Sequence, residues 1–236
     1  MIKSDICGLE KMLGAEILPG SLILVTGAEG TLKSSLVFSM ISNHLATHGD
    51  HGLYVTLEQS KESHLLNMNS LGIKKRDGLH IFDYQDMRRE WKDREPDLIQ
   101  MTNEVIDFYK DKYDDLTLFS LDSLNALYSY SGEDNLRNKI YHFFLNLRDK
   151  DLTYFLIMES PPSRMAGLLS DFNRPERFLA DGIIELGIIE GKGGVKRYIQ
   201  ILKMRAAKHA MEKHQITIET DGIQILGPIY SAAPKD

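Results

Sequence analysis

Short apolar runs and amphipathic stretches alternate along the first three-quarters of the chain. The apolar runs have the length of strands and cover residues 21–26, 53–57, 79–82, 116–121 and 153–158. Between them, apolar residues recur at helical spacing over residues 34–48, 61–71, 97–112 and 136–147. This alternation predicts βαβ units around a mostly parallel sheet. In residues 97–112, the buried face is expected to contain Leu98, Met101, Val105 and Phe108.

The pattern changes after residue 180. Strand-like segments follow one another without helices between them, at residues 183–189, 197–204, 215–219 and 223–226. Residues 191–194 and the pair Asp221-Gly222 look like hairpin turns. The sheet is therefore expected to be extended by C-terminal antiparallel strands. Residues 1–230 are expected to form one domain, with a charged surface loop at 88–96 and a disordered tail at 231–236.

Composition narrows the class of protein. A chain of 236 residues fits one α/β domain, and 42% hydrophobic with 26% charged residues is typical of a globular protein. The formal net charge of −6 argues against a chain that binds nucleic acid by charge alone. A single cysteine, Cys7, excludes an intramolecular disulfide. No apolar run approaches the ~18–20 residues of a membrane span, and the N-terminus has no apolar signal-peptide core. We expect a cytoplasmic protein without a membrane partner.

One octapeptide carries the strongest chemical signal. Residues 27–34 nearly match the phosphate-binding pattern G-x-x-x-x-G-K-[ST], between a predicted strand and a predicted helix. In such a loop, backbone N–H groups cradle the phosphates, the lysine reaches the β- and γ-phosphates, and the serine ligates Mg²⁺. The expected nucleotide-binding residues are Gly27, Ala28, Glu29, Gly30, Thr31, Leu32, Lys33, Ser34 and Ser35. The alternative is a glycine-containing turn with a surface lysine.

Leu32 is the one departure from this pattern, because it stands where a glycine normally precedes the lysine. A leucine has fewer backbone conformations open to it than a glycine. The substitution leaves Gly27, Gly30, Lys33 and Ser34 in place. We therefore expect nucleotide binding, and the departure puts the rate of hydrolysis in question.

Acidic residues follow three of the predicted strands. Asp122 ends the run 116–121, where it is expected to anchor Mg²⁺ together with Ser34. Glu58 ends the run 53–57 and could activate the attacking water, whereas Gln59 can only form hydrogen bonds. Glu159 could contact the same site. The alternatives are a turn residue for Asp122 and a helix-capping region for Glu58.

The region from Glu190 to His214 is basic in an otherwise acidic chain. This region contains seven basic residues and only two acidic ones. The basic residues are Lys192, Lys196, Arg197, Lys203, Arg205, Lys208 and Lys213, and the acidic residues are Glu190 and Glu212. Strand alternation would place Lys203 and Arg205 on the same side, where two cations suit a polyphosphate and Arg can act as a finger on a transferring phosphate. The alternative is a solvated strand edge.

These segments, in their order and separation, resemble the KaiC-like branch of the RecA superfamily of ATPases over nearly the whole chain. The similar blocks are residues 6–14 (ICGLEKMLG), 53–60 (LYVTLEQS), 120–124 (SLDSL), 178–184 (FLADGII) and 203–209 (KMRAAKH), together with the phosphate loop. The resemblance implies a RecA-like αβα core that binds ATP and Mg²⁺ between adjacent subunits, commonly in hexameric rings. It implies that Glu58 activates water and that Lys203 and Arg205 reach a neighbour's γ-phosphate. Gln59 stands where the family has a second glutamate. Because this sequence contains one copy of the domain, the resemblance does not imply kinase activity.

Three functions remain open at this point. The first is a regulatory ATPase that hydrolyses ATP slowly and whose nucleotide state controls assembly or partner binding. The second is an ATP-sensing module that recruits an unidentified protein partner without turnover. The third is a recombinase or repair paralogue acting on DNA, for which the loop at 161–176 offers only Arg164, Arg174 and Phe172.

Overall fold

A computed structural model of the chain describes residues 2, 5–83, 86, 97–130, 136–160, 175–191 and 194–229. The charged loop expected at 88–96, nearly all of the loop at 161–176 and the tail at 231–236 lie outside the described residues.

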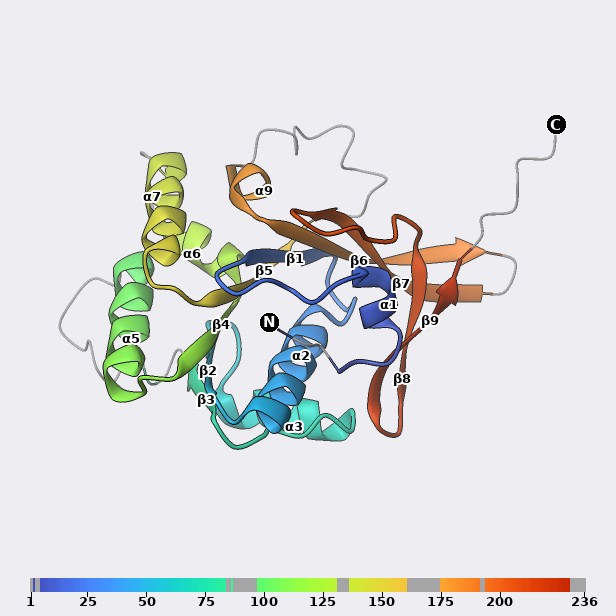
Figure 1. Cartoon of the computed structure of the whole chain (residues 1–236), viewed down its shortest axis with the longest axis horizontal. Helices are drawn as coiled ribbons and strands as arrows, with labels where there is room; N and C mark the ends of the chain where they lie inside the picture. The colour runs from blue at the N-terminus through green and yellow to red at the C-terminus, as the bar shows by residue number, and fades with distance from the viewer. Residues whose placement is uncertain are drawn as a thin grey trace.

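A single nine-stranded sheet forms the centre of the molecule (Figure 1). Its spatial order is β3-β2-β4-β5-β1-β6-β7-β8-β9. The strands are β1 (Leu22–Gly27), β2 (His51–Thr56), β3 (Leu79–Asp83), β4 (Leu116–Asp122), β5 (Thr153–Glu159), β6 (Gly182–Gly191), β7 (Gly194–Met204), β8 (His214–Glu219) and β9 (Gly222–Pro228). Neighbours from β3 to β6 pair in parallel, and β6 to β9 pair antiparallel. The predicted parallel sheet with C-terminal antiparallel strands is confirmed.

Helices cover both faces of the parallel part of the sheet. They are α1 (Leu9–Leu13), α2 (Lys33–His48), α3 (Lys61–Ser70), α5 (Leu98–Lys112), α6 (Leu124–Tyr130), α7 (Leu136–Arg148) and α9 (Pro175–Leu179). Residues of α1, α2 and α3 share one buried apolar cluster, and residues of α5, α6 and α7 share the other. Figure 1 shows α2 and α3 on one side of the sheet and α5, α6 and α7 on the other.

The strand β1 illustrates why the sequence forms this layered structure. All six of its residues are buried. Because side chains alternate along a strand, Ile23 and Val25 enter one apolar cluster while Leu22 and Leu24 enter the other. A strand covered on both faces needs a continuous apolar run, and this explains the strong signal in the sequence.

The helix boundaries follow local capping chemistry where the sequence offers it. The Asp97 carboxylate caps α5 by accepting hydrogen bonds from the N–H groups of Ile99 and Gln100 at 3.0 and 3.2 Å. The prediction that Phe108 lies on the buried face of α5 is wrong, because that side chain is 60% exposed. Thr102 and Ile106 are buried instead, so that the buried residues of α5 recur at i, i+3, i+4, i+7 and i+8 on one helix face, and Phe108 lies beside that face.

Two short connections join strands of the antiparallel part, one between β6 and β7 and one between β8 and β9. Gly191 pairs with Gly194, as the glycine-rich segment predicts. Glu219 pairs with Gly222, so residues 220–221 form the second turn, one residue earlier than predicted, and Gly222 begins β9. None of the helices described is both long and apolar enough to span a membrane.

Candidate nucleotide-binding site

Four neighbouring strands end at the same edge of the sheet and bring the predicted site residues together. β2, β4, β5 and β1 are adjacent and parallel, with Thr56 beside Asp122, Asp122 beside Ile157, and Gly27 beside Glu159. Ligands of open α/β sheets bind beyond the carboxyl ends of strands. The loop after β1, Asp122, Glu159 and the segment after β2 therefore share one site.

The loop from Gly27 to Ser34 connects β1 directly to α2. A side chain at Gly27 would collide with the Leu186 carbonyl oxygen of β6, which lies 2.1 Å from the ideal Cβ position. Leu32 precedes α2 in the left-handed conformation, with φ 76° and ψ 24°, and no side chain caps the helix. The first N–H groups of α2 thus lack a side-chain acceptor, and their partial positive charge favours an anion such as phosphate.

Lys33 lies within the loop rather than in solvent. It is 6% exposed, and its Nζ donates to the Ala28 carbonyl oxygen at 2.9 Å. Glu159 lies on the other side, with its Oε1 3.7 Å from Nζ. The reading of Lys33 as an exposed surface lysine is therefore wrong. Thr31 also donates to the Ala28 carbonyl, at 2.7 Å, and so holds the loop closed.

Asp122 is buried at the carboxyl end of β4, with 4% of its surface exposed. Burial raises the pKa of its carboxyl above the ordinary value, against the opposing effects of hydrogen bonds from Tyr54 and Ser34 and of the Lys33 charge. The Tyr54 hydroxyl donates to Asp122 Oδ2 at 2.8 Å. Burial, followed by the charge of Asp122, raises the pKa of Tyr54 well above its ordinary value, so its hydroxyl remains a donor.

Glu58 lies two residues beyond β2 and is exposed to the site. The Ser123 hydroxyl donates to Glu58 Oε1, so a residue adjacent to Asp122 orients the predicted base. Gln59 is held differently, because its side-chain oxygen accepts from Asn67 of α3 at 3.0 Å. The peptide bond between Asp122 and Ser123 is cis.

These groups line one cavity of about 290 Å³. Its walls include the loop residues 29–35 as well as Glu58, Gln59, Asn67, Met68, Leu71, Asp122, Ser123, Ile157 and Glu159. The Ser34 hydroxyl and the Asp122 carboxylate are in hydrogen-bond contact, and both are the hard oxygen donors that Mg²⁺ prefers. The described residues hold no group of three or more His, Cys, Asp or Glu side chains suited to a metal ion.

Sequence reasoning missed Arg197, which the structure places against the loop. Its Nε donates to the Gly30 carbonyl oxygen at 3.0 Å, across 167 residues of sequence. The contact depends on β6 lying beside β1, which brings β7 close to the loop. The basic stretch of the sequence contains Arg197, but nothing local predicts this neighbour.

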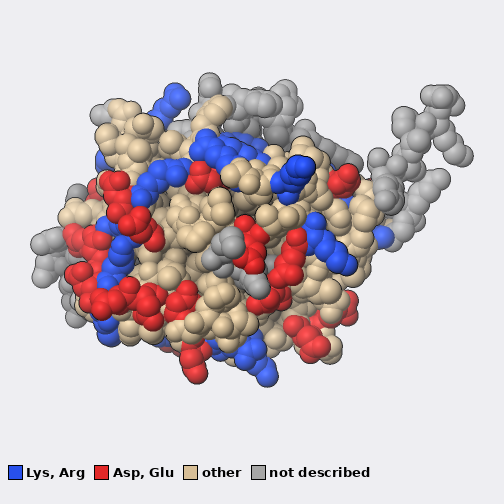
Figure 2. Space-filling view, in the orientation of Figure 1, with Lys and Arg blue, Asp and Glu red and all other residues tan. Residues whose placement is uncertain are grey.

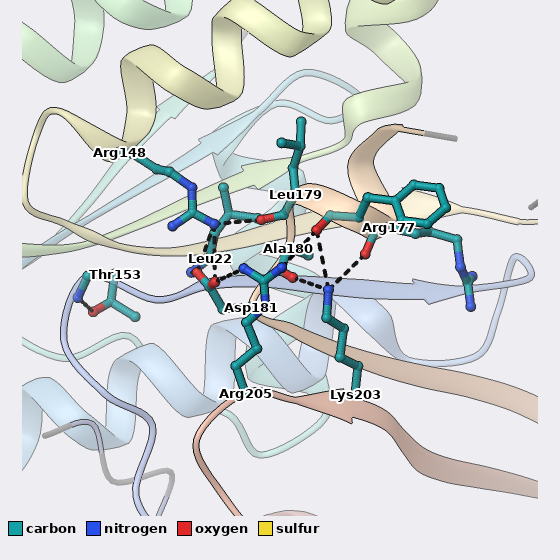
Figure 3. A network of polar contacts seen from close by, with 11 residues as sticks. Leu22, Arg148, Thr153, Arg177, Leu179, Ala180, Asp181, Lys203 and Arg205 are labelled. Atoms are coloured by element: carbon teal, nitrogen blue, oxygen red, sulfur yellow. Dashed lines mark hydrogen bonds and ion pairs between the residues drawn. The ribbon is translucent and has the colours of Figure 1, made fainter. Parts of the chain in front are cut away.

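Lys203 and Arg205 both contact the segment 177–181, and they lie near the amino end of β1 rather than near the phosphate loop at its carboxyl end. Lys203 Nζ donates to the carbonyl oxygens of Ala180, Arg177 and Phe178 at 2.6, 3.2 and 3.3 Å (Figure 3). All three donors of its ammonium group are thus used. Burial, and next the Arg205 charge, lowers the pKa of Lys203.

Arg205 is held by Asp181 and remains half exposed. Its Nη1 donates to Asp181 Oδ1 at 2.9 Å and its Nη2 to the Phe178 carbonyl oxygen at 3.2 Å, while 55% of the side chain is exposed. The Arg148 Nη2 lies 3.1 Å from both carboxylate oxygens of Asp181. Burial works to raise the pKa of Asp181, but hydrogen bonds from Arg148, the Leu22 N–H and Arg205 leave it below the ordinary value.

These cations are far from the loop of their own chain. Met204 pairs with Gly182, and Gly182 pairs with Ile23, four residues before Gly27 on β1. At about 3.3 Å per residue, the separation along the strand is about 13 Å. Figure 2 shows Lys and Arg gathered along the upper side of the molecule, in the region of α9 and the end of β7. The loop at 161–176, which the recombinase alternative would need, lies almost wholly outside the described residues.

Comparison with known proteins gives one consistent result. A family model described as "ATPase: KaiC" matches residues 2–229. The chain is 26% identical over 226 residues to the circadian clock protein KaiC3 of Synechocystis sp. (strain PCC 6803), and 29% identical over 245 residues to the circadian clock oscillator protein KaiC of Picosynechococcus sp. (strain PCC 7002). These matches cover 93% and 95% of this chain but 42% and 44% of the relatives. The chain therefore spans less than half the length of the curated relatives it matches.

A solved structure matches over nearly its full length. The crystal structure of a KaiC-like protein from the hyperthermophilic archaeon Pyrococcus horikoshii OT3 superimposes with a TM-score of 0.79 at 25% identity. The match covers 96% of this chain and 98% of that chain. The predicted fold class agrees with this likeness.

Proposed function

Because this chain belongs to the KaiC ATPase family of the RecA superfamily, we propose that it binds ATP with Mg²⁺ and hydrolyses it slowly, and that its nucleotide state controls assembly or partner binding. One observation carries the proposal: a single cavity brings the loop with Lys33 and Ser34 against Glu58 and Asp122.

The loop, the two acidic residues Asp122 and Glu58, and Ser123 have defined tasks in this proposal. The N–H groups of the loop and the Lys33 ammonium bind the phosphates, for which Lys33 gives up the Ala28 carbonyl. Ser34 and Asp122 hold Mg²⁺, which, when bound, neutralises phosphate charge. Glu58, oriented by Ser123, accepts the proton of the attacking water.

The slow rate follows from two local features. Gln59 cannot accept a proton and is tied to Asn67 of α3. Leu32 fixes a left-handed backbone at the point where the loop must follow the phosphates. An ATP-sensing module without turnover is the second candidate, and these same two features favour it.

The remaining step assigns Lys203 and Arg205 to a neighbouring subunit. Neither cation reaches the loop of its own chain, about 13 Å away along β1. Arg205 is the better candidate for a contact in trans, since its guanidinium has five N–H donors and makes two side-chain hydrogen bonds within the described part of the chain. Lys203 has no spare donor without breaking a bond to a carbonyl. A nucleotide shared in this way would stabilise a ring of subunits by mass action.

The test combines nucleotide binding, turnover and assembly. Lys33→Ala should weaken the binding of ATP with Mg²⁺ tenfold or more, because a hydrogen bond to a charged group contributes about 1.5–3 kcal/mol. Lys74→Ala, an exposed lysine before β3, is the matched control and should bind ATP normally. Unchanged affinity in a folded Lys33→Ala protein would overturn the proposed site. Release of radiolabelled phosphate separates the slow ATPase from the sensing module, and salt-dependent DNA binding would favour the recombinase reading.

A further inference from the structure

We infer that Tyr54 is a positioning residue that holds the Asp122 carboxylate in the orientation needed to anchor Mg²⁺. This inference rests on the proposed function, because it concerns the same metal site. It adds a buried residue that does not line the nucleotide cavity.

The contact joins two neighbouring strands inside the molecule. Tyr54 of β2 pairs with Ser120 of β4, and Thr56 pairs with Asp122, so the tyrosine reaches diagonally across the strands to the carboxylate. Its hydroxyl donates to Asp122 Oδ2 at 2.8 Å. Tyr54 is fully buried and Asp122 is 4% exposed. Ser34 bonds to the same carboxylate from α2, so hydroxyl groups from two elements fix its orientation.

The tyrosine ring is itself held in place. Phe38 of α2 packs against it edge-on, with ring centroids 5.5 Å apart and an interplanar angle of 69°. His64 of α3 packs on it at 4.7 Å and contacts Phe38 at 5.2 Å. Burial lowers the pKa of His64 to about 4, so the imidazole is neutral at pH 7 and adds no charge near Asp122. The three rings therefore fix the position of the hydroxyl without disturbing the charge of the site.

A second buried tyrosine shows what an ordinary core tyrosine does here. Tyr154 of β5 is 1% exposed, and its hydroxyl donates to the backbone carbonyl of Leu147. That bond satisfies a buried donor and serves no ligand. Tyr54 instead donates to the side chain of a predicted metal ligand. Partners that orient metal ligands typically contribute about 10–100-fold to metal affinity.

The experiment compares Tyr54→Phe with Tyr154→Phe in the full chain. Each variant loses one buried hydroxyl and keeps its aromatic ring, so urea unfolding should show comparable destabilisation. The affinity for the fluorescent analogue mant-ATP is then measured against Mg²⁺ concentration, and again in EDTA. In Tyr54→Phe, the Mg²⁺ concentration for half-maximal effect should rise about tenfold or more, while the affinity in EDTA stays at the wild-type value. Tyr154→Phe should match the wild type in both measurements.

Two results would overturn the inference. One is a wild-type Mg²⁺ dependence in Tyr54→Phe, which would leave the tyrosine as a core residue only. The other is an equal loss of affinity with and without Mg²⁺, or a loss of fold in Tyr54→Phe alone, which would indicate a general distortion. As a second check, Tyr54→Phe should add no further loss in an Asp122→Ala background, because the pair acts as a unit. If the wild type binds no mant-ATP at any Mg²⁺ concentration, the proposed function itself fails, and this outcome is distinct from a failure of the inference alone.

Discussion

Leu32 combines an unfavourable backbone conformation with a favourable apolar contact, and the two can be separated by mutation. Its φ of 76° places an L-residue in the left-handed region, at a cost of about 1–2 kcal/mol. Its side chain is half-buried against the apolar cluster of α1, α2 and α3. Full burial of a leucine contributes about 1.5–3 kcal/mol, so this contact stabilises by about 1 kcal/mol.

Two substitutions at Leu32 isolate the backbone contribution. Leu32→Ala removes most of the side chain and keeps the strain, so it should destabilise the protein by about 1 kcal/mol. Leu32→Gly removes both the side chain and the backbone strain, but the greater conformational freedom of glycine in the unfolded chain lowers the free energy of unfolding by about 0.4–1 kcal/mol. The glycine variant should therefore be more stable than the alanine variant by about 1 kcal/mol, although it has the smaller side chain. For a domain of this size, that difference corresponds to about 2–4 °C in Tm.

Equilibrium urea unfolding measures both variants, and Ala46→Gly supplies a control of opposite sign. Ala46 is exposed in the ordinary helical backbone of α2, where glycine is less stable than alanine by about 0.5–1 kcal/mol. An alanine variant at Leu32 that equals or exceeds the glycine variant in stability would refute the claim of a strained loop. Leu32→Gly should also keep ATP binding and hydrolyse ATP at an equal or higher rate.

Three further predictions concern catalysis, assembly and pH. Glu58→Gln should retain ATP and stop its hydrolysis, and an unchanged phosphate release rate would remove Glu58 as the base. Arg205→Ala should weaken ATP-dependent assembly. Mixing this variant with Lys33→Ala should recover activity at interfaces that pair an intact loop with an intact arginine. If mixing recovers no activity and assembly does not depend on ATP, the contact in trans is excluded. Burial lowers the pKa of His64 from 6.5 to about 4, so between these values the unfolded chain binds a proton that the folded chain does not. The contribution of neutral His64 to the free energy of unfolding is therefore present above pH 6.5 and is lost as the pH falls toward 4. In His64→Phe, the free energy of unfolding measured with urea should change less with pH over this range. An unchanged pH dependence would contradict the assignment.

The parts of the site that could be predicted from the sequence are those defined by their own strand. Asp122 and Glu159 end buried strands, and Glu58 follows one closely. The carboxyl ends of parallel strands meet at one edge, so a local pattern was sufficient to group them. The phosphate loop is equally local, because strand, loop and helix are consecutive in the chain.

The parts that could not be predicted depend on which strands become neighbours. Arg197 reaches Gly30 only because β6 pairs with both β1 and β7 and so brings β7 close to the loop after β1. Tyr54 reaches Asp122 only because β2 pairs with β4 in one register. A shift of one residue in that register would turn the tyrosine to the opposite face. Periodicity gives the face of a strand but not its neighbour, so these contacts had no signal in the sequence.

The arrangement of charge along β1 links the proposed chemistry to the proposed assembly. The carboxyl end of β1 carries the phosphate loop, and its amino end is bound to Asp181, whose carboxylate accepts from the Leu22 N–H at 3.0 Å. The same carboxylate holds Arg205. One rigid strand therefore joins the site where a chain would bind its own nucleotide to the arginine it would offer to a neighbour. Since Leu22 and Gly27 are five residues apart on β1, a separation of about 17 Å along the strand, Arg205 does not reach the phosphate loop of its own chain. On the proposed function, a complete catalytic site requires two subunits, and hydrolysis should depend on protein concentration in the range where the ring dissociates.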